Sequence, residues 1–225
     1  MDGLVIFGLG KIGQAVASLI EEEGGDPRIL AYCCDRAHLP AIPEWRGRPV
    51  LAFEEIEAAF PPDRCAMLVA IGYHDLNHVR EARCAAARAK GYRLASWVSR
   101  HAHVPASASI GENCVVMPGA MLQPFATLEE GVFLWHGAVV GHHARIGAQG
   151  WLASNCTISS TARLGARCFV GVNAAIGHEL EIGADTLIGA GAVITRSTEP
   201  GGVYITPETP RFRLDSTRFR RIARI

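Results

Sequence analysis

LWHGAVVGHHARIGAQGWLASNCTI, at residues 134–158, contains the pattern that decides the fold. An aliphatic residue recurs at every sixth position, and the series continues in both directions from this stretch. It runs from Val104 to Ile194, and each of its sixteen positions holds Val, Ile or Leu. Four residues after the aliphatic position stands mostly a small residue, such as Ala138 or Cys156. Self-similarity at a fixed period indicates one structural unit stacked many times.

A period of six fits neither a lone helix nor a sheet of long strands. It predicts a solenoid whose coil has three short strands and three turns, so that sixteen hexapeptides make about five coils. The aliphatic residue points inward, the small residue fills the remaining interior, and a following glycine serves the turn. Cys114, Cys156 and Cys168 occupy the small interior position, so we expect them to be structural.

The first hundred residues alternate between strand and helix patterns. An apolar run at 4–7 precedes Gly8-Leu9-Gly10-Lys11-Ile12-Gly13 and a helical pattern at 11–23, and a second strand at 28–33 ends near Asp35. A G-x-G-x-x-G between strand and helix, with an acid about 20 residues on, is typical of nucleotide-binding folds. Later patterns indicate helices at 53–60 and 76–90 and strands at 67–71 and 93–97. This alternation predicts a doubly wound parallel sheet, a Rossmann-like domain.

The length of this region argues against a full dinucleotide site. A complete dinucleotide fold has six strands in two halves, and only about five strands fit before Val104. One half can hold a nucleoside diphosphate at a helix N-terminus, so a nucleotide-linked sugar is the expected ligand. The alternative is that the glycines only pack the helix on the strand. The candidate ligand-binding residues are Gly8, Gly10, Lys11, Asp35, Tyr73 and His74.

Composition narrows the function classes. The 225 residues include 22 basic and 22 acidic side chains, so the net charge of zero argues against a nucleic-acid partner or a polybasic membrane anchor. No apolar run approaches the roughly 18 residues of a membrane span, and no signal peptide is recognisable. Seven cysteines without a C-x-x-C motif favour free thiols in the cytoplasm. We expect a Rossmann-like domain at 1–100, a solenoid at 101–199 and a C-terminal tail at 200–225.

The whole chain resembles a family of sugar O- and N-acyltransferases. This family includes sialic acid O-acetyltransferases and bacterial acetyltransferases that act on nucleotide-linked amino sugars. The resemblance rests on segments 5–10, 70–73, 134–147, 171–174 and 188–194. It implies an all-β left-handed parallel β-helix, a homotrimer, and acetyl-CoA bound in the cleft between neighbouring helices. It also implies that the N-terminal domain holds a nucleotide-linked amino sugar.

The resemblance assigns roles to residues on the turns of the solenoid. His142 matches the catalytic base, and the backbone N–H of Ser160, one coil further on, matches the oxyanion donor. Relatives often carry an acid next to the base to orient it, and His143 stands there in this chain, with Glu179 as another candidate. Ser160, Gly189, Ala190 and Gly191 are the residues expected to contact acyl-CoA. The alternative for His142 is a solvated turn residue.

The expected reaction is transfer of an acetyl group from acetyl-CoA to an amino group of a nucleotide-linked sugar, in the biosynthesis of a surface polysaccharide. O-acetylation of a sugar hydroxyl is the alternative. A metal-dependent hydratase is one rival, because His142 and His178 resemble part of the ligand set of γ-class carbonic anhydrases, which are also left-handed β-helices. The third ligand position of that set holds Gly183 in this chain, so no metal is expected. A non-catalytic binding module is the remaining rival.

Overall fold

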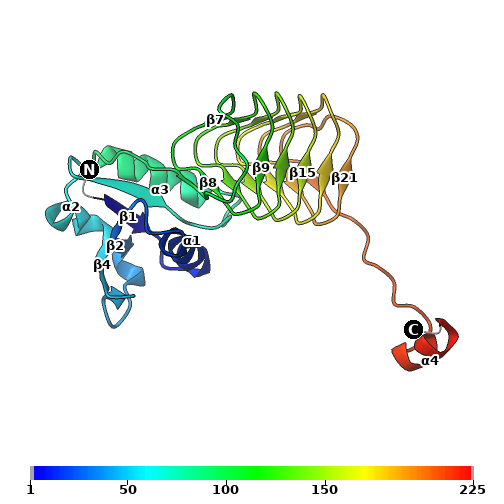
Figure 1. Cartoon of the computed structure of the whole chain (residues 1–225), viewed down its shortest axis with the longest axis horizontal. Helices are drawn as coiled ribbons and strands as arrows, with labels where there is room; N and C mark the ends of the chain where they lie inside the picture. Colours follow the sequence, from blue (N-terminus) through cyan, green and yellow to red (C-terminus); the bar gives the residue numbers. More distant parts are fainter. Residues whose placement is uncertain (1–2, 224–225) are drawn as a thin grey trace.

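Two regions of different architecture make up the chain, and the computed structural model describes residues 3–223 (Figure 1). The first is an α/β region, and the second is a long solenoid of short strands. A segment beyond the solenoid ends in the helix α4 (Ser216–Ala223), which stands apart from both regions in Figure 1. The two expected fold classes are therefore confirmed.

The α/β region is built on a five-stranded sheet in the order β3-β4-β2-β1-β5. All neighbouring strands are parallel except β3 and β4, which form an antiparallel hairpin. Helix α1 packs on one face of the sheet, and α2 and α3 pack on the other. The elements are β1 (Gly3–Phe7), α1 (Lys11–Glu22), β2 (Ile29–Cys34), η1 (Arg36–His38), β3 (Glu44–Trp45), β4 (Arg48–Ala52), η2 (Phe53–Glu55), α2 (Ile56–Ala59), β5 (Cys65–Val69) and α3 (His78–Ala89).

Two parts of this sheet differ from the sequence expectation. The hairpin of β3 and β4 was not anticipated, because its strands are short and interrupted by Pro49 and Gly47. The strand expected at 93–97 is wrong: Leu94 makes a single bridge with Met67, and the next paired residues already belong to the solenoid. The chain passes from one region to the other too quickly to form a full strand here.

The solenoid consists of two-residue strands that stack in parallel, and each pairs with the strand 18 residues away, except that β20 and β22 pair at a spacing of 16. The stacked strands form three flat sheets, here called faces 1, 2 and 3. Face 1 contains β7 (Ser109–Ile110), β10 (Thr127–Leu128), β13 (Arg145–Ile146), β16 (Arg163–Leu164) and β19 (Glu181–Ile182). Face 2 contains β6 (Trp97–Val98), β8 (Val115–Val116), β11 (Phe133–Leu134), β14 (Trp151–Leu152), β17 (Phe169–Val170), β20 (Leu187–Ile188) and β22 (Val203–Tyr204). Face 3 contains β9 (Met121–Leu122), β12 (Val139–Val140), β15 (Thr157–Ile158), β18 (Ala175–Ile176) and β21 (Val193–Ile194).

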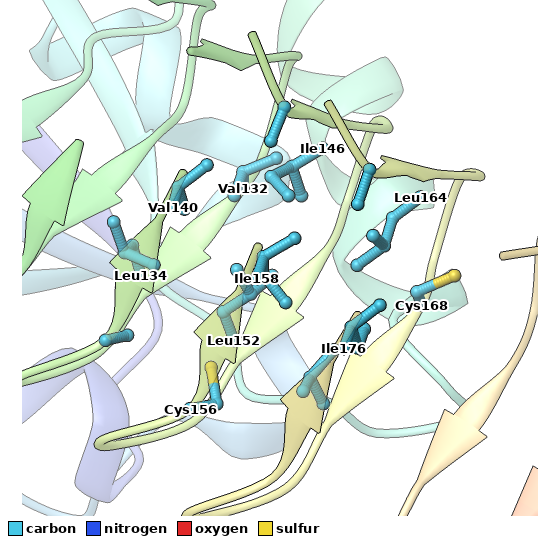
Figure 2. Packing of buried hydrophobic residues seen from close by; sticks show 14 of the residues in the cluster. Val132, Leu134, Val140, Ile146, Leu152, Cys156, Ile158, Leu164, Cys168 and Ile176 are labelled. Carbon is cyan, nitrogen blue, oxygen red and sulfur yellow. The ribbon is translucent and has the colours of Figure 1, made fainter. Parts of the chain in front are cut away.

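The predicted aliphatic series forms the interior of the solenoid. Leu134, Val140 and Ile146 come from three different faces and point into the same coil, as Figure 2 shows. Cys156 and Cys168 lie in the same core, where burial raises the pKa of the Cys156 thiol to about 12. A buried, protonated thiol is a poor nucleophile, which agrees with the structural role expected for these cysteines.

The turns correct one part of the sequence interpretation. Left-handed φ angles recur every six residues, three positions after the aliphatic residue; Asn155 (φ 58°) and Gly137 (φ 68°) are examples. Asn and Gly adopt this conformation at least strain. The glycine directly after the aliphatic residue has no such angle, so it does not serve the turn. A Cβ at Gly141 would lie 2.5 Å from the backbone nitrogen of Ser160, so glycine allows the next coil to approach closely.

The α/β region packs against face 2 of the solenoid. The outward side chains Phe133 and Trp151 are buried there, in the same apolar cluster as α1. Arg80 of α3 is fully buried and donates to the backbone carbonyl oxygen of Gln149 at 2.7 Å, with its guanidinium 4.7 Å from the Phe133 ring centroid. Burial lowers the pKa of Arg80 to about 10, so the side chain stays charged at neutral pH. This contact fixes one region relative to the other.

Candidate functional site

All six residues predicted to bind a nucleotide-linked ligand line adjoining cavities at the carboxyl edge of the sheet. Gly8, Gly10, Lys11, Tyr73 and His74 line a cavity of about 370 Å³. The sixth, Asp35, lines a neighbouring cavity of about 390 Å³ that shares the two glycines. Ligands of doubly wound sheets bind at this edge, beyond the ends of the parallel strands.

The structure separates the roles of the three glycines in the motif. Gly8 has φ +116°, and a Cβ there would lie 2.8 Å from the carbonyl oxygen of Ala70. A Cβ on Gly13 would overlap the carbonyl oxygen of Gly8. Gly13 therefore lets α1 pack closely on the end of β1, and Gly8 lets the chain after β1 approach the segment after β5. Gly10 has nothing within 4 Å of a built Cβ, so of the three motif glycines it alone has open space where a side chain would lie.

The charges around the cavity suit an anionic ligand. Lys11 is the first residue of α1, and the first turn of this helix has no acidic residue, so its N–H groups and dipole are free to attract an anion. Asp35 forms an ion pair with Arg83 of α3, in which Nη2 of the arginine lies 2.8 Å from Oδ2 of the aspartate. Arg83 lines the same cavity and was missed by sequence reasoning, because no motif marks it and only the packing of α3 brings it there.

A strained loop joins the cavity to the solenoid. Asp75, Leu76 and Asn77 have consecutive left-handed φ angles of 48°, 43° and 71°. Just before them, the Tyr73 ring packs 5.1 Å from the Trp151 ring on face 2. Left-handed φ angles at these residues persist only when surrounding contacts hold the loop in place. Arg80 supplies one such contact, because its guanidinium donates to the Asn77 side chain at 3.0 Å. The wall of the cavity is thus set by contacts with the solenoid.

The histidine pair lies on a turn of the solenoid between β12 and β13. His142 and His143 are both exposed, and their Nδ1 atoms lie 3.2 Å apart. His143 has a left-handed φ of 59°, and its ring packs 4.8 Å from that of Phe125. The backbone N–H of His142 donates to the Gln123 side chain at 3.0 Å. If His142 donates from Nδ1, its Nε2 carries the free lone pair that a proton acceptor needs.

Glu179, the other candidate for orienting His142, has no described side-chain contact with either histidine. Its backbone N–H donates to the carbonyl oxygen of Ser160 at 3.1 Å. The contact that the structure provides for His142 is therefore His143. An imidazole therefore stands at the position where the resemblance led us to expect an acid.

The amide of Ser160 is placed to serve as a hydrogen-bond donor. Thr161, the next residue, donates its N–H to the carbonyl oxygen of His142 at 2.9 Å, so Ser160 lies one coil from the histidine pair. Within residues 3–223 the N–H of Ser160 has no described acceptor. A Cβ at position 141 would lie 2.5 Å from the nitrogen of Ser160, so a larger residue there would crowd this amide. The same close approach recurs along the solenoid at Gly147, Gly165 and Gly171, and the last of these lies against the Ala190 amide, within the segment expected to contact acyl-CoA.

The histidine turn lies away from the nucleotide cavity in a single chain. Residues 141–144 join face 3 to face 1, whereas the α/β region packs on face 2 and on the turns between faces 1 and 2. His142 therefore occupies the one corner of the triangular coil that face 2 does not reach. A ligand held in the cavity of one chain is not positioned to meet His142 of the same chain.

Metal-ligand clusters and membrane-spanning helices were both sought among the residues that the structure describes. No group of three or more His, Cys, Asp or Glu side chains suited to a metal ion occurs among the described residues. Among the helices of residues 3–223, none combines the length and the apolar character needed to cross a bilayer.

Comparisons with known proteins agree with this architecture. The family model "Bacterial transferase hexapeptide (six repeats)" matches residues 107–142 and 161–196. PerB from Caulobacter crescentus, solved with CoA and GDP-perosamine, is 27% identical, with a TM-score of 0.79, and the match covers 89% of this chain and 92% of that chain. Residues 107–142 and 161–196 are thus hexapeptide repeats of the bacterial transferase type, and the whole chain has the fold of left-handed β-helix acetyltransferases. This similarity favours an acyltransferase over a non-catalytic binding module.

Other structures resemble this acyltransferase to differing degrees. The acetyltransferase domain of PglB from Neisseria gonorrhoeae FA1090, solved with acetyl coenzyme A, is 27% identical with a TM-score of 0.80, and the match covers 90% of this chain and 95% of that chain. WeeI from Acinetobacter baumannii AYE, 21% identical with a TM-score of 0.59 over 89% of this chain and 94% of that chain, supports the fold alone. No curated protein sequence gives a significant match.

Proposed function

We propose that this acyltransferase moves an acetyl group from acetyl-CoA to an amino group of a nucleotide-linked sugar. One observation carries the proposal: the chain combines a cavity suited to a nucleoside diphosphate with a histidine pair one coil from a backbone amide that has no described acceptor. The similarity to PerB, solved with CoA and GDP-perosamine, supports this combination of substrates. The product would enter the assembly of a surface polysaccharide.

His142 acts as the general base in this proposal. Its Nε2 removes a proton from the sugar amine as the amine nitrogen attacks the thioester carbonyl carbon. The imidazolium that forms keeps its Nδ1–H bond to His143, which holds the ring in place and accepts part of the positive charge. The C–S bond then breaks, and coenzyme A leaves with its sulfur protonated by the imidazolium. No covalent enzyme intermediate is required.

The Ser160 amide stabilises the oxyanion of the tetrahedral intermediate. A fixed N–H donor needs no reorganisation during the reaction, which is why such donors contribute strongly to rate. Gly189, Ala190 and Gly191 lie at the turn after β20, and they contact the acyl-CoA chain in this proposal. Within residues 3–223 the Ala190 amide, like that of Ser160, has no described acceptor, which suits a ligand with carbonyl oxygens.

The acceptor binds through its nucleotide at the edge of the sheet. The diphosphate lies at the N-terminus of α1 beside Gly10 and Lys11, and Asp35 and Arg83 lie in the adjoining cavity that takes the nucleoside. Tyr73 and His74 border the path toward the sugar. A sugar hydroxyl is the alternative acceptor, since the same base could deprotonate it.

We further propose a homotrimer, in which a second chain completes each site. Face 3 exposes a row of outward side chains that is mostly apolar, including Met121 (38% exposed) and Val193 (67% exposed). Face 1 is polar at the matching positions, with Arg145 and Arg163 pointing outward. Packing face 3 against a neighbour covers the apolar row and brings the histidine turn beside another chain. The seven cysteines are buried thiols and not disulfides, which suits a reducing cytoplasm.

The test is an assay of CoA release with a panel of nucleoside-diphosphate-linked sugars. The panel contains purine and pyrimidine nucleotides, each with an amino sugar and its matched hydroxy sugar. We expect acetylation of one amino sugar, confirmed by the mass of the product, and no reaction with its hydroxy counterpart. Reaction of the hydroxy sugars alone would establish the O-acetyl alternative, and inactivity with the whole panel together with no thermal stabilisation by any member would overturn the proposed acceptor class.

A further inference from the structure

The C-terminal segment is scarcely buried against the rest of the molecule. After β22 the chain leaves the solenoid, and every residue of 205–223 is exposed except the half-buried Leu214 (Figure 1). No residue placed in the proposed catalytic or nucleotide site belongs to this segment. The segment therefore needs an explanation separate from acetyl transfer.

The helix α4 has two faces of different chemistry. Asp215 caps it by accepting the N–H of Arg218 at 2.9 Å. At 100° per residue, Phe219, Ile222 and Ala223 fall on one side of the helix, and the arginines fall on the other and along both borders. Phe212 extends the apolar side, with its ring 5.5 Å from that of Phe219. The apolar side chains remain open to solvent, and Ile222 is 72% exposed.

An isolated helix of this length is marginal in water. A helix shorter than about 12 residues gains too few hydrogen bonds to repay nucleation, so it needs a surface that covers its apolar side. Burial of Phe219 and Ile222 would supply part of that stabilisation. The amphipathic pattern therefore indicates a docking element.

The charge of the C-terminal segment indicates which kind of surface α4 would dock on. Residues 207–225 contain six arginines and two acidic residues, a net charge of +4, which leaves sixteen basic and twenty acidic residues in the rest of the chain. The whole-chain charge of zero, on which the expectation of no membrane partner rested, hides this separation. The arginines border the apolar side of α4, so the matching surface has an apolar layer beneath a layer of negative charge. Phospholipid acyl chains beneath anionic headgroups have this arrangement.

We infer that residues 211–223 dock the enzyme on an anionic phospholipid surface, with Phe212, Phe219 and Ile222 in the outer acyl layer and the arginines at the phosphates. Arginine suits this position because its guanidinium binds phosphate oxygens in a bidentate manner while its methylene groups lie along apolar surface. The helix lies in the plane of the interface and does not span it. Binding of this kind is reversible and weakens with salt.

The test is sedimentation of the full-length protein with vesicles of phosphatidylcholine alone or mixed with phosphatidylglycerol. The wild type should sediment with the mixed vesicles, less so at high salt, and not with phosphatidylcholine alone. Replacing Arg218, Arg220 and Arg221 together by Gln should weaken partition by about 100-fold, at roughly fivefold for each charge. Phe219→Ser with Ile222→Ser should abolish binding at any salt concentration.

Ile42→Ser is the matched control, because Ile42 is equally exposed (75%) but lies in the α/β region. This variant should bind vesicles as the wild type does, and all variants should keep their acetyl-transfer rate with soluble substrates. Equal binding to both kinds of vesicle, or binding unaffected by the tail variants, would overturn the inference. So would a change in oligomeric state caused by Phe219→Ser with Ile222→Ser, since the apolar side would then bind another copy of the chain.

Discussion

The orienting role of His143 can be tested by removing its nitrogen atoms while keeping its ring. His143→Phe preserves an aromatic ring against Phe125 and removes the Nδ1 that lies 3.2 Å from His142. The lost contact is a hydrogen bond at the long end of the normal range between exposed groups. It becomes charge-assisted once His142 takes the proton, which strengthens it in the transition state by about 1 kcal/mol. We therefore expect kcat to fall about fivefold, with KM for both substrates unchanged.

The comparison with His142→Ala makes this prediction decisive. Loss of the base should lower kcat about 10²–10⁴-fold, and the residual rate should rise with pH as the acceptor amine loses its own proton. The double variant should be no slower than His142→Ala, because an orienting residue has nothing to orient once the base is gone. His178→Ala, which removes another exposed histidine two coils away, should change kcat little. The reasoning fails if His143→Phe is as slow as His142→Ala, or if His142→Ala keeps most of its activity.

Four further outcomes follow from the structure. Gly10→Val should weaken nucleotide-sugar binding without affecting acetyl-CoA binding or the melting temperature, whereas Gly13→Ala should destabilise the fold by about 1–3 kcal/mol through overlap with backbone. Sedimentation should give about 72 kDa, three times the 24.1 kDa of one chain, and Val139→Glu on face 3 should shift the protein to monomers that lose activity. A thiol reagent at mild pH should label none of the seven buried cysteines until denaturant is added. The hydrogen bond from Arg167 holds the pKa of Asp185 below its ordinary value, so Asp185 stabilises the fold above about pH 4. The difference in urea midpoint between wild type and Asp185→Asn should therefore shrink as the pH falls below that point.

Local patterns in the sequence predicted most of the architecture, because each pattern reports a short-range constraint. The six-residue spacing from Val104 to Ile194 determined the solenoid, since every repeat must bury the same side of a two-residue strand. The motif at 8–13 predicted the first strand, the first helix and the edge where a ligand cavity lies. The hairpin at 44–52 escaped notice because its short strands contain too few residues to show a period.

Contacts between distant segments decided what the patterns left open. The sequence offered both Gly8 and Gly10 as ligand contacts, and only the packing around the end of β1 separated the open Gly10 from the crowded Gly8. It left His143 and Glu179 as alternatives for orienting His142, and the position of each side chain on its turn brought His143 into contact. Arg83 and Arg80 carried no signal, because their roles depend on where α3 packs. A repeating pattern specifies the coil, but the surface on which that coil meets another element depends on side chains far apart in the chain.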